Sequence, residues 1–515
     1  MTPKQIDYLL KNHESRSVKE MAAALGLDRK EVQRELRKLL AGEAGARSEA
    51  AAGEAKRGRK GWVHACVVAI LVLSVFALYA KSLSYPFLNW DDPNYVTENR
   101  LIRSLGPAHL AEMFTKPHFN LYIPLTLVSY AVDYKLSGFD SRSYHLTNVT
   151  LHAANTCLAY ILVVLVTGDA LAAFAVALVF ALHPVQIESV AWIAERKNVL
   201  SSLFFFLALI AYLVQAARPD PARRTIRLVL AFSLAFFLAA LLSKPNVVVL
   251  PLLLFAYHVC HGGVRKKEWL GLAVFLAAAL AFAMITVEIS RDVGKLKYYG
   301  GSFVATARVM TVVMTKYFEL LFWPARQSLL YSFPVYPSVA EAPVAFSLLG
   351  LFGAAAGLVI LWFKEKKLFF WGAWYFILLL PVMNIVPFPS LMNDRYLYLP
   401  LVGFFALLFL LLRRYAGPMV LILAVALAVP AWAFLNLKRQ EVWANPEALW
   451  LETQAKTEEK SHVSFVNLGG HYLDQGEWDK AIAAFEKAIS LYQEPLAYGG
   501  LGIAYFRKGD YAKAV

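Results

Sequence analysis

The sequence is short of charged residues and has few cysteines. Asp, Glu, Lys and Arg make up 17% of its 515 residues, whereas 58% are hydrophobic. A soluble domain carries about 25% charged residues, so we expect much of this chain to lie in lipid. The three cysteines, Cys66, Cys157 and Cys260, fall in apolar segments without CxxC spacing, and they support neither a metal site nor a disulfide framework.

A cleavable signal peptide is also missing, because the first sixty residues are polar. We therefore expect the first apolar run, 62–80, to remain as a membrane anchor. The net charge of +14 does not by itself indicate a nucleic-acid partner, since many basic residues cluster between apolar runs, as orientation signals do. Nucleic acid is thus not an expected partner.

Residues 1–45 are polar and helical in pattern. The stretch SVKEMAAALGLDRKEVQRELRKLL (17–40) predicts a helix, a glycine-containing turn and a second helix. Such a helix-turn-helix-like module can bind DNA, but on a membrane-tethered chain we favour a cytoplasmic helical bundle or a partner-docking module. Residues 46–61 contain KRGRK near their end and predict a flexible basic linker.

Residues 62–440 predict a polytopic, all-α membrane domain. Runs of roughly 17–25 apolar residues can cross a bilayer, and we expect about 11 spans. The candidates are 62–80, 146–167, 170–184, 197–216, 228–243, 247–262, 269–287, 344–363, 369–386, 397–412 and 418–436. Basic clusters after alternate runs predict a cytoplasmic N-terminus, provided that the charged run 303–323 lies in the interface or re-enters the membrane.

Residues 441–515 predict an extracytoplasmic α-solenoid of tetratricopeptide repeats. The stretch 466–489 recurs in 498–515 at an offset of 33 residues, with Leu468 matching Leu501, and this offset is close to the 34 of that repeat. Two incomplete repeats cannot bury their own faces well. We therefore expect either a longer native chain or packing of the repeats on the membrane domain.

The predicted orientation places the polar loops on the same outer side as the repeats. The first of these loops carries two adjacent carboxylates, Asp91 and Asp92, directly after the first span. Such a pair can act as a general base for an incoming hydroxyl, hold a divalent cation, or cap a juxtamembrane helix that begins at Pro93. The sequence leaves these three uses open.

Cations in the outer loops violate the positive-inside trend and therefore predict an anionic ligand. Arg395, Arg196 and Lys197 are candidates for binding a phosphate. The alternative for Arg196 and Lys197 is an ion pair with a neighbouring glutamate. Lys244 lies at another outer end, and snorkelling to the interface explains its position. The polar residues expected to support the site are His183, Glu188, Asp394 and Tyr396, although the tyrosine also fits an interfacial aromatic belt.

Five short motifs occur in one order before the repeats. They are LNWDDPNYV, YIPLTLVSYAVDY, YHLTNVTLHAANT, HPVQIESVAWIAERKN and DRYLYLP. This order resembles the transmembrane-and-tetratricopeptide-repeat O-mannosyltransferases and their bacterial relatives, from about residue 85 to the end. The N-terminal module departs from that pattern and has no counterpart in it.

The resemblance implies a glycosyltransferase of the GT-C superfamily. Such an enzyme transfers a sugar, with inversion, from a polyprenyl-phosphate-linked donor to a protein hydroxyl, and an acidic residue of the first outer loop is essential. Carried over, that residue is Asp91 or Asp92. No cofactor is required; a divalent cation on the same pair is an alternative. The expected partners are the donor lipid, membrane lipids and an acceptor protein held by the repeats, and the expected location is a bacterial inner membrane.

Two other functions, a repeat scaffold and a transporter, fit the sequence less well than the transferase. A membrane-anchored repeat scaffold for extracytoplasmic assembly needs far fewer spans and no polar site on one side. A transporter predicts inverted repeats and ionisable residues in the middle of its spans, whereas the central parts of these spans are nearly free of charge.

Overall fold

The computed structural model describes residues 1–13, 15–216, 223–292, 296–388, 390–457 and 461–515. These residues form helices and no strand; one isolated bridge joins His118 and Leu121. The chain divides into two compact units, Met1–Ile70 and Leu71–Val515. Each unit is described separately below.

The first unit contains α1 (Pro3–Asn12), α2 (Val18–Leu25) and the start of α3 (Arg29–Tyr79), the helix that continues into the second unit. The side chains of Thr2 and Ser17 cap the first two helices, and α2 ends at Gly26 in the left-handed conformation, with φ of 64°. This conformation favours glycine because glycine has no Cβ. It directs the chain into the turn that begins α3.

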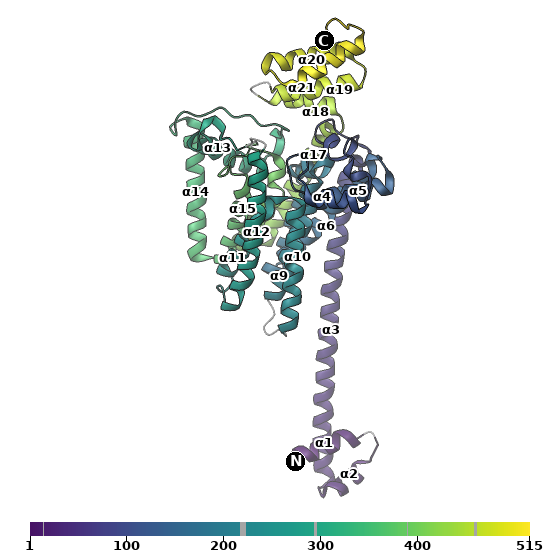
Figure 1. The fold of residues 1–515 in the computed structure, drawn as a ribbon. Helices are drawn as coiled ribbons and strands as arrows, with labels where there is room; N and C mark the ends of the chain where they lie inside the picture. Colours follow the sequence, from purple (N-terminus) through teal and green to yellow (C-terminus); the bar gives the residue numbers. More distant parts are fainter. Residues whose placement is uncertain (14, 217–222, 293–295, 389, 458–460) are drawn as a thin grey trace. The chain divides into compact units, whose positions relative to one another are not determined.

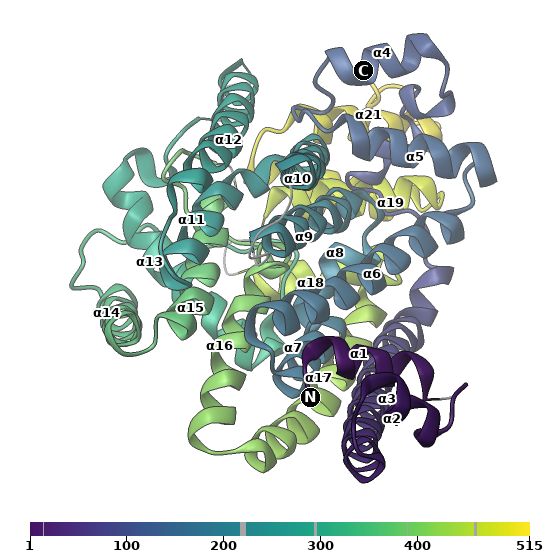
Figure 2. The same ribbon diagram turned by 90° about the horizontal axis from the view of Figure 1, so that it is seen from below.

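The second unit is a bundle with short helices and repeats at one end. Helices α6, α7, α9, α10 and α16 form its centre, where α9 packs on α6 and α10, and α7 packs on α6 and α16 (Figure 2). The bundle helices are α6 (Ser141–Thr167), α7 (Ala170–Leu182), α8 (Ile187–Ala191), α9 (Arg196–Ala216), α10 (Arg223–Ser243), α11 (Leu250–Cys260), α12 (Lys266–Asp292), α13 (Phe303–Phe322), α14 (Ala342–Lys364), α15 (Lys366–Leu379), α16 (Pro400–Tyr415) and α17 (Pro418–Trp443).

Six helices of the described chain are long and apolar enough to cross a membrane, or seven if α7 and α8, which are bent by 54° at His183, form one span. The chain is therefore an integral membrane protein, but the expectation of about 11 spans is not confirmed. Several predicted spans form shorter helices, such as α11 and α15. The charged helix α13 is not among the six.

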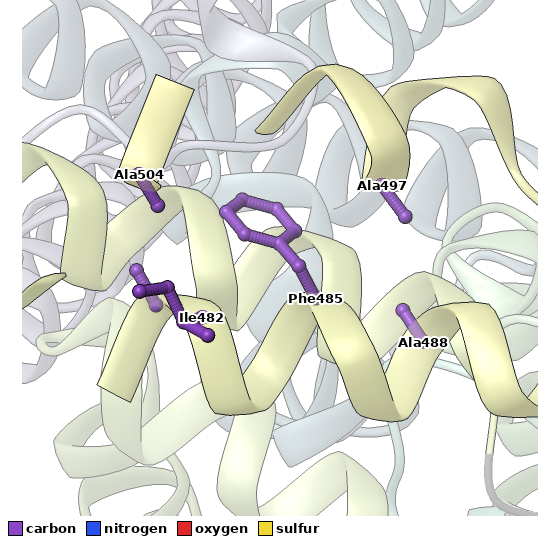
Figure 3. Close-up of a cluster of buried hydrophobic side chains, with 6 residues drawn as sticks. Ile482, Phe485, Ala488, Ala497 and Ala504 are labelled. Carbon is purple, nitrogen blue, oxygen red and sulfur yellow. The ribbon is translucent and has the colours of Figure 1, made fainter. Parts of the chain in front are cut away.

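The repeats follow α17 at the end of the bundle that also carries α4 (Pro107–Thr115) and α5 (Pro124–Ser137) (Figure 1). They comprise α18 (Pro446–Lys456), α19 (His462–Asp474), α20 (Trp478–Leu491) and α21 (Pro495–Lys508). The ring of Phe485 points from α20 toward α21, between Ala497 and Ala504 (Figure 3). A Cβ at Gly469 would lie 2.8 Å from this ring, so a glycine is needed there for α19 to approach α20.

Candidate active site

The first loop of the second unit is held in place by the carboxylate of Asp92. One oxygen accepts a hydrogen bond from the Leu88 amide at 2.8 Å, and the other accepts one from the Ala194 amide at 2.9 Å. Asp92 is only 1% exposed, whereas Asp91 is half-buried. The two carboxylates therefore have different environments: Asp92 joins the loop to the turn before α9, whereas Asp91 is more exposed.

Burial dominates the ionisation of Asp92. Loss of hydration raises its pKa to about 7, although the two backbone amides and the Lys197 ammonium act against that rise and the neighbouring Asp91 adds to it. This carboxyl therefore changes charge near neutral pH. Lys197 lies close enough to both aspartates to interact with their charges.

An ion cluster joins three segments that are distant in the sequence. Arg395 pairs with Glu188 through its guanidinium, and its backbone amide donates to the same carboxylate at 2.8 Å. Its Nε lies 3.3 Å from Glu195, which also pairs with Lys197 at 3.1 Å and with Lys244 at 3.0 Å. Both glutamates are buried, so the cations that surround them offset the cost of burying their charge.

Beside this cluster lies a small cleft between α9, α15 and the segment before α16. Its polar lining consists of Asn198, Ser201, Ser202, Lys244, Asn246, Arg395, Tyr396 and Tyr398, and its apolar lining of Val247, Leu378, Val382, Leu399 and Pro400. Two cations and no carboxylate line the cleft. An anion that enters it therefore meets Arg395 and Lys244, while their glutamate partners lie behind them.

Aromatic rings enclose the third cation of the cluster. The ammonium of Lys197 lies 4.6 Å from the centre of the Tyr95 ring and 5.6 Å from that of Trp192, and it donates to the Ala194 carbonyl at 2.8 Å. The side chain is buried. Lys197 thus links the Asp92 loop to Glu195 and does not line the cleft.

The structure places Arg196 in a different environment from Arg395. Its guanidinium is fully buried, lies 2.5 Å from Asp133, donates to Asn148 at 2.9 Å, and stacks over Tyr130 with 4.5 Å to the ring centre. These contacts join α9 to α5 and α6. Arg196 therefore forms an ion pair within the protein, with Asp133 and not with a neighbouring glutamate, and we propose no phosphate role for it.

His183 and Asp394 also make contacts within the protein. The His183 ring contacts the Leu321 carbonyl at 3.0 Å and accepts from the Val185 amide at 3.3 Å, at the break between α7 and α8. Asp394 accepts from Gln327 at 2.7 Å and from the Tyr331 hydroxyl at 2.5 Å. Burial, and then the charge of Glu188, raises the pKa of Asp394 to about 7. Neither His183 nor Asp394 lines the cleft; of the residues expected to support the site, Tyr396 does.

Lys244 is the site residue whose role the sequence did not indicate. It follows α10 and precedes Pro245, and its ammonium also donates to Asn198 at 3.1 Å. A lysine in an outer turn violates the positive-inside trend just as Arg395 does. From the sequence alone, snorkelling of Lys244 to the interface explains this violation equally well. The ion pair with Glu195 distinguishes the two explanations.

The loop that carries the aspartates also contacts the repeats. Asn89 donates to the Asn467 carbonyl of α19 at 2.6 Å and accepts from the Trp450 indole of α18 at 3.1 Å. Next to it, Trp90 stacks on Trp192 with ring centres 4.6 Å apart and an interplanar angle of 4°. The start of the repeats is thereby fixed to the aspartate loop.

The aspartate pair does not fit the alternative role of a metal site. The described residues contain no group of three or more His, Cys, Asp or Glu side chains arranged to hold a metal ion. Both oxygens of Asp92 already accept backbone hydrogen bonds in a buried position. We therefore derive no step that uses a metal.

Comparison with known proteins bears on both parts of the chain. A model of the tetratricopeptide repeat matches residues 466–515. The chain is 33% identical to the protein O-mannosyl-transferase TMTC2 of Homo sapiens over 168 residues, which cover 31% of this chain and 20% of that protein. It is 39% identical to tmtc2 of Xenopus laevis over 92 residues, 18% of this chain and 11% of that protein.

The predicted family resemblance is confirmed. The chain has the repeats and the apolar helices expected of it, and the relatives that it matches include protein O-mannosyl-transferases. The match spans about a fifth of the length of the human and mouse TMTC2 proteins. The chain also aligns with an Archaeoglobus fulgidus oligosaccharyltransferase at 15% identity and a TM-score of 0.45, covering 82% of this chain and 59% of that one.

Proposed function

We propose that this chain is a membrane glycosyltransferase of the GT-C type. It transfers a sugar, with inversion, from a polyprenyl-phosphate-linked donor to a hydroxyl group of a protein, on the extracytoplasmic face of a bacterial inner membrane. Its relatives named O-mannosyl-transferases support the transfer of a sugar to protein oxygen. The observation that carries the proposal is the cleft that two cations line. One of these cations, Arg395, is connected to the aspartate loop through Glu195 and Lys197.

The leaving phosphate of the donor binds in this cleft. Arg395 is charged at all working pH values and donates in a fixed planar geometry that suits phosphate oxygens. Lys244 adds a second positive charge on the same wall. Negative charge grows on the phosphate as the bond to the sugar breaks, so fixed cations stabilise the transition state more than the bound donor. The apolar part of the lining faces the lipid portion of the donor.

Asp91 is the general base. It removes the proton from the acceptor hydroxyl as that oxygen attacks C1 of the sugar, and the bond from C1 to the phosphate oxygen breaks with its electron pair going to the phosphate. Attack from the face opposite the leaving group inverts the anomeric carbon. Asp92 is a positioning residue, because both of its oxygens hold backbone amides.

The repeats present the acceptor protein. Solenoids of this kind form concave surfaces suited to extended segments, and here the first repeat helices contact Asn89, two residues before Asp91. An acceptor bound on the repeats is therefore delivered to the loop that holds the base.

Expression in a host that lacks the chain tests the proposed function. Intact-mass spectrometry of extracytoplasmic proteins is expected to show added sugar masses with the wild-type chain and none with the empty vector. Arg395→Lys keeps the ion pair with Glu188 but loses the planar donor. The fraction of protein that carries added sugar is therefore expected to fall strongly. The same glycoforms with the wild-type chain, Arg395→Lys and the empty vector would contradict the transferase and favour the repeat scaffold.

A further inference from the structure

The first unit presents a basic helix face that the proposed transferase does not use. After the left-handed turn at Gly26, α3 begins with Arg29 and Lys30. The same turn contains Glu31, and the Asp28 side chain accepts a hydrogen bond from the Lys30 amide at 3.1 Å, so this helix end is capped locally. The side chains of Arg29 and Lys30 remain exposed.

Packing of the three helices determines which face of α3 is exposed. Val32 and Leu36 of α3 are buried against Leu9 of α1 and Met21 of α2. The opposite side chains are exposed, and four cations and one amide line a shallow hollow there: Lys30, Gln33, Arg34, Arg37 and Lys38. Glu35 pairs with Lys38 at 3.0 Å and lies 3.9 Å from Arg34. Within the part of the chain that the structure describes, Lys30 and Arg37 form no ion pair.

The shape of the unit matches one class of anionic ligand. In a helix-turn-helix, the second helix lies in the major groove of a DNA duplex while the first crosses the backbone. Here α2, the turn at 26–28 and α3 follow that order. Arginine and lysine suit phosphates and guanine, and glutamine suits adenine, so the exposed side chains have the chemistry for both contacts.

A membrane surface fits this face less well. Helices that bind in the interface insert apolar side chains among the lipids. Among residues 2–13 and 15–39, no large hydrophobic side chain is exposed, because the leucines, valines and methionine pack between the three helices. The face offers charge without an apolar anchor.

We propose that α2 and the first turns of α3 bind double-stranded DNA, with Lys30, Arg34 and Arg37 on phosphates and Gln33 at the base edges. DNA bound to this unit would be held by a chain whose apolar helices anchor it in a membrane. This inference is independent of the transferase chemistry and revises the expectation that nucleic acid is not a partner.

Fluorescence anisotropy tests the proposal with the full chain in phosphatidylcholine nanodiscs and a labelled pool of random 20-base-pair duplexes. The wild-type chain is expected to bind, and its affinity is expected to fall as salt rises. The double variant Arg34→Gln, Arg37→Gln is expected to bind about tenfold or more weakly, with a slope of log affinity against log salt that is smaller by about 2. Lys4→Gln, Lys11→Gln on α1 removes the same charge and is expected to leave binding unchanged.

Equal duplex binding by wild type and the α3 double variant would overturn the proposal. Equal losses in the two double variants would also overturn it, because the effect would then be one of net charge. Flotation with phosphatidylglycerol vesicles separates the lipid alternative: a variant that loses vesicle binding but keeps duplex binding would assign the face to lipid headgroups. All four substituted side chains are exposed, and circular dichroism checks that the variants are folded.

Discussion

Asn89 and Trp450 connect the aspartate loop to the repeats: the indole of Trp450 donates to the Asn89 side-chain oxygen at 3.1 Å. The two residues are 361 positions apart in the sequence. Trp450 is 1% exposed, and its ring also meets the edge of Trp90 with 5.6 Å between ring centres. The residues beside the candidate base are therefore packed on the part of the chain that we expect to hold the acceptor.

Trp450→Phe is expected to weaken this connection while keeping most of the aromatic contact. The substitution leaves the Asn89 oxygen without its indole donor, so transfer to a protein acceptor is expected to fall several-fold. Quantitative intact-mass spectrometry of the acceptor measures the loss. Trp269→Phe is the control, since Trp269 is 55% exposed on α12; an equal loss in both variants would show that the connection does not matter.

Gly469→Ala is expected to destabilise the repeats. The added Cβ would lie 2.8 Å from the Phe485 ring, and overpacking of this kind costs about 1–3 kcal/mol. Gly499→Ala is the matched control, because no atom lies within 4 Å of its added Cβ. Thermal unfolding of the two variants measures the difference. A Gly469→Ala protein as stable as the control would contradict the packing of α19 on α20.

The ionisation of Asp92 predicts a pH-dependent stability. Its pKa in the folded chain, about 7, lies above the 3.8 of an unperturbed aspartate, so the folded state holds the proton more tightly than the unfolded state. The stability that this proton contributes is present below pH 4 and is lost as the pH rises through about 7. Asp92→Asn cannot titrate. The wild-type melting temperature is therefore expected to fall relative to that of the variant between pH 4 and pH 7, and a constant difference would contradict the raised pKa.

Removal of one cation from the cleft is expected to weaken donor binding. Lys244→Gln leaves Glu195 paired with Lys197 and Arg395, so the cluster stays neutralised while the cleft loses one positive charge. The KM for the lipid-phosphate sugar donor is expected to rise about tenfold, the effect of about 1.4 kcal/mol. Lys316→Gln on α13 is the control, because Lys316 is exposed to solvent at 44% and pairs with Glu319. Unchanged donor kinetics in Lys244→Gln would remove this residue from the phosphate site.

The repeats and the membrane character were predictable because they depend on local patterns. Leu468, Gly469 and their counterparts recur at a fixed spacing, and long apolar runs identify spans whatever their partners are. The number of spans was less predictable. Helices such as α11 and α15 are too short to cross alone, and the break at Pro184 divides one apolar run between α7 and α8.

The sequence does not predict which partner each site residue contacts. Arg196 and Lys197 are adjacent on α9, yet one pairs with Asp133 and the other with Glu195, because successive helical positions point in different directions. Asp91 and Asp92 are likewise adjacent, and they are distinguished by the burial of Asp92 and its contacts with Leu88 and Ala194. Such partners are fixed by tertiary packing, which one sequence does not reveal.

The most direct test of the central claim is the effect of Asp91→Asn on protein glycosylation in a host that lacks the chain. Asp140→Asn is the matched control, because Asp140 is an exposed aspartate that caps α6. We expect intact-mass spectrometry to show no added sugar with Asp91→Asn and wild-type glycoforms with Asp140→Asn, at equal amounts of folded protein in the membrane. Wild-type glycoforms with Asp91→Asn would contradict its role as the base.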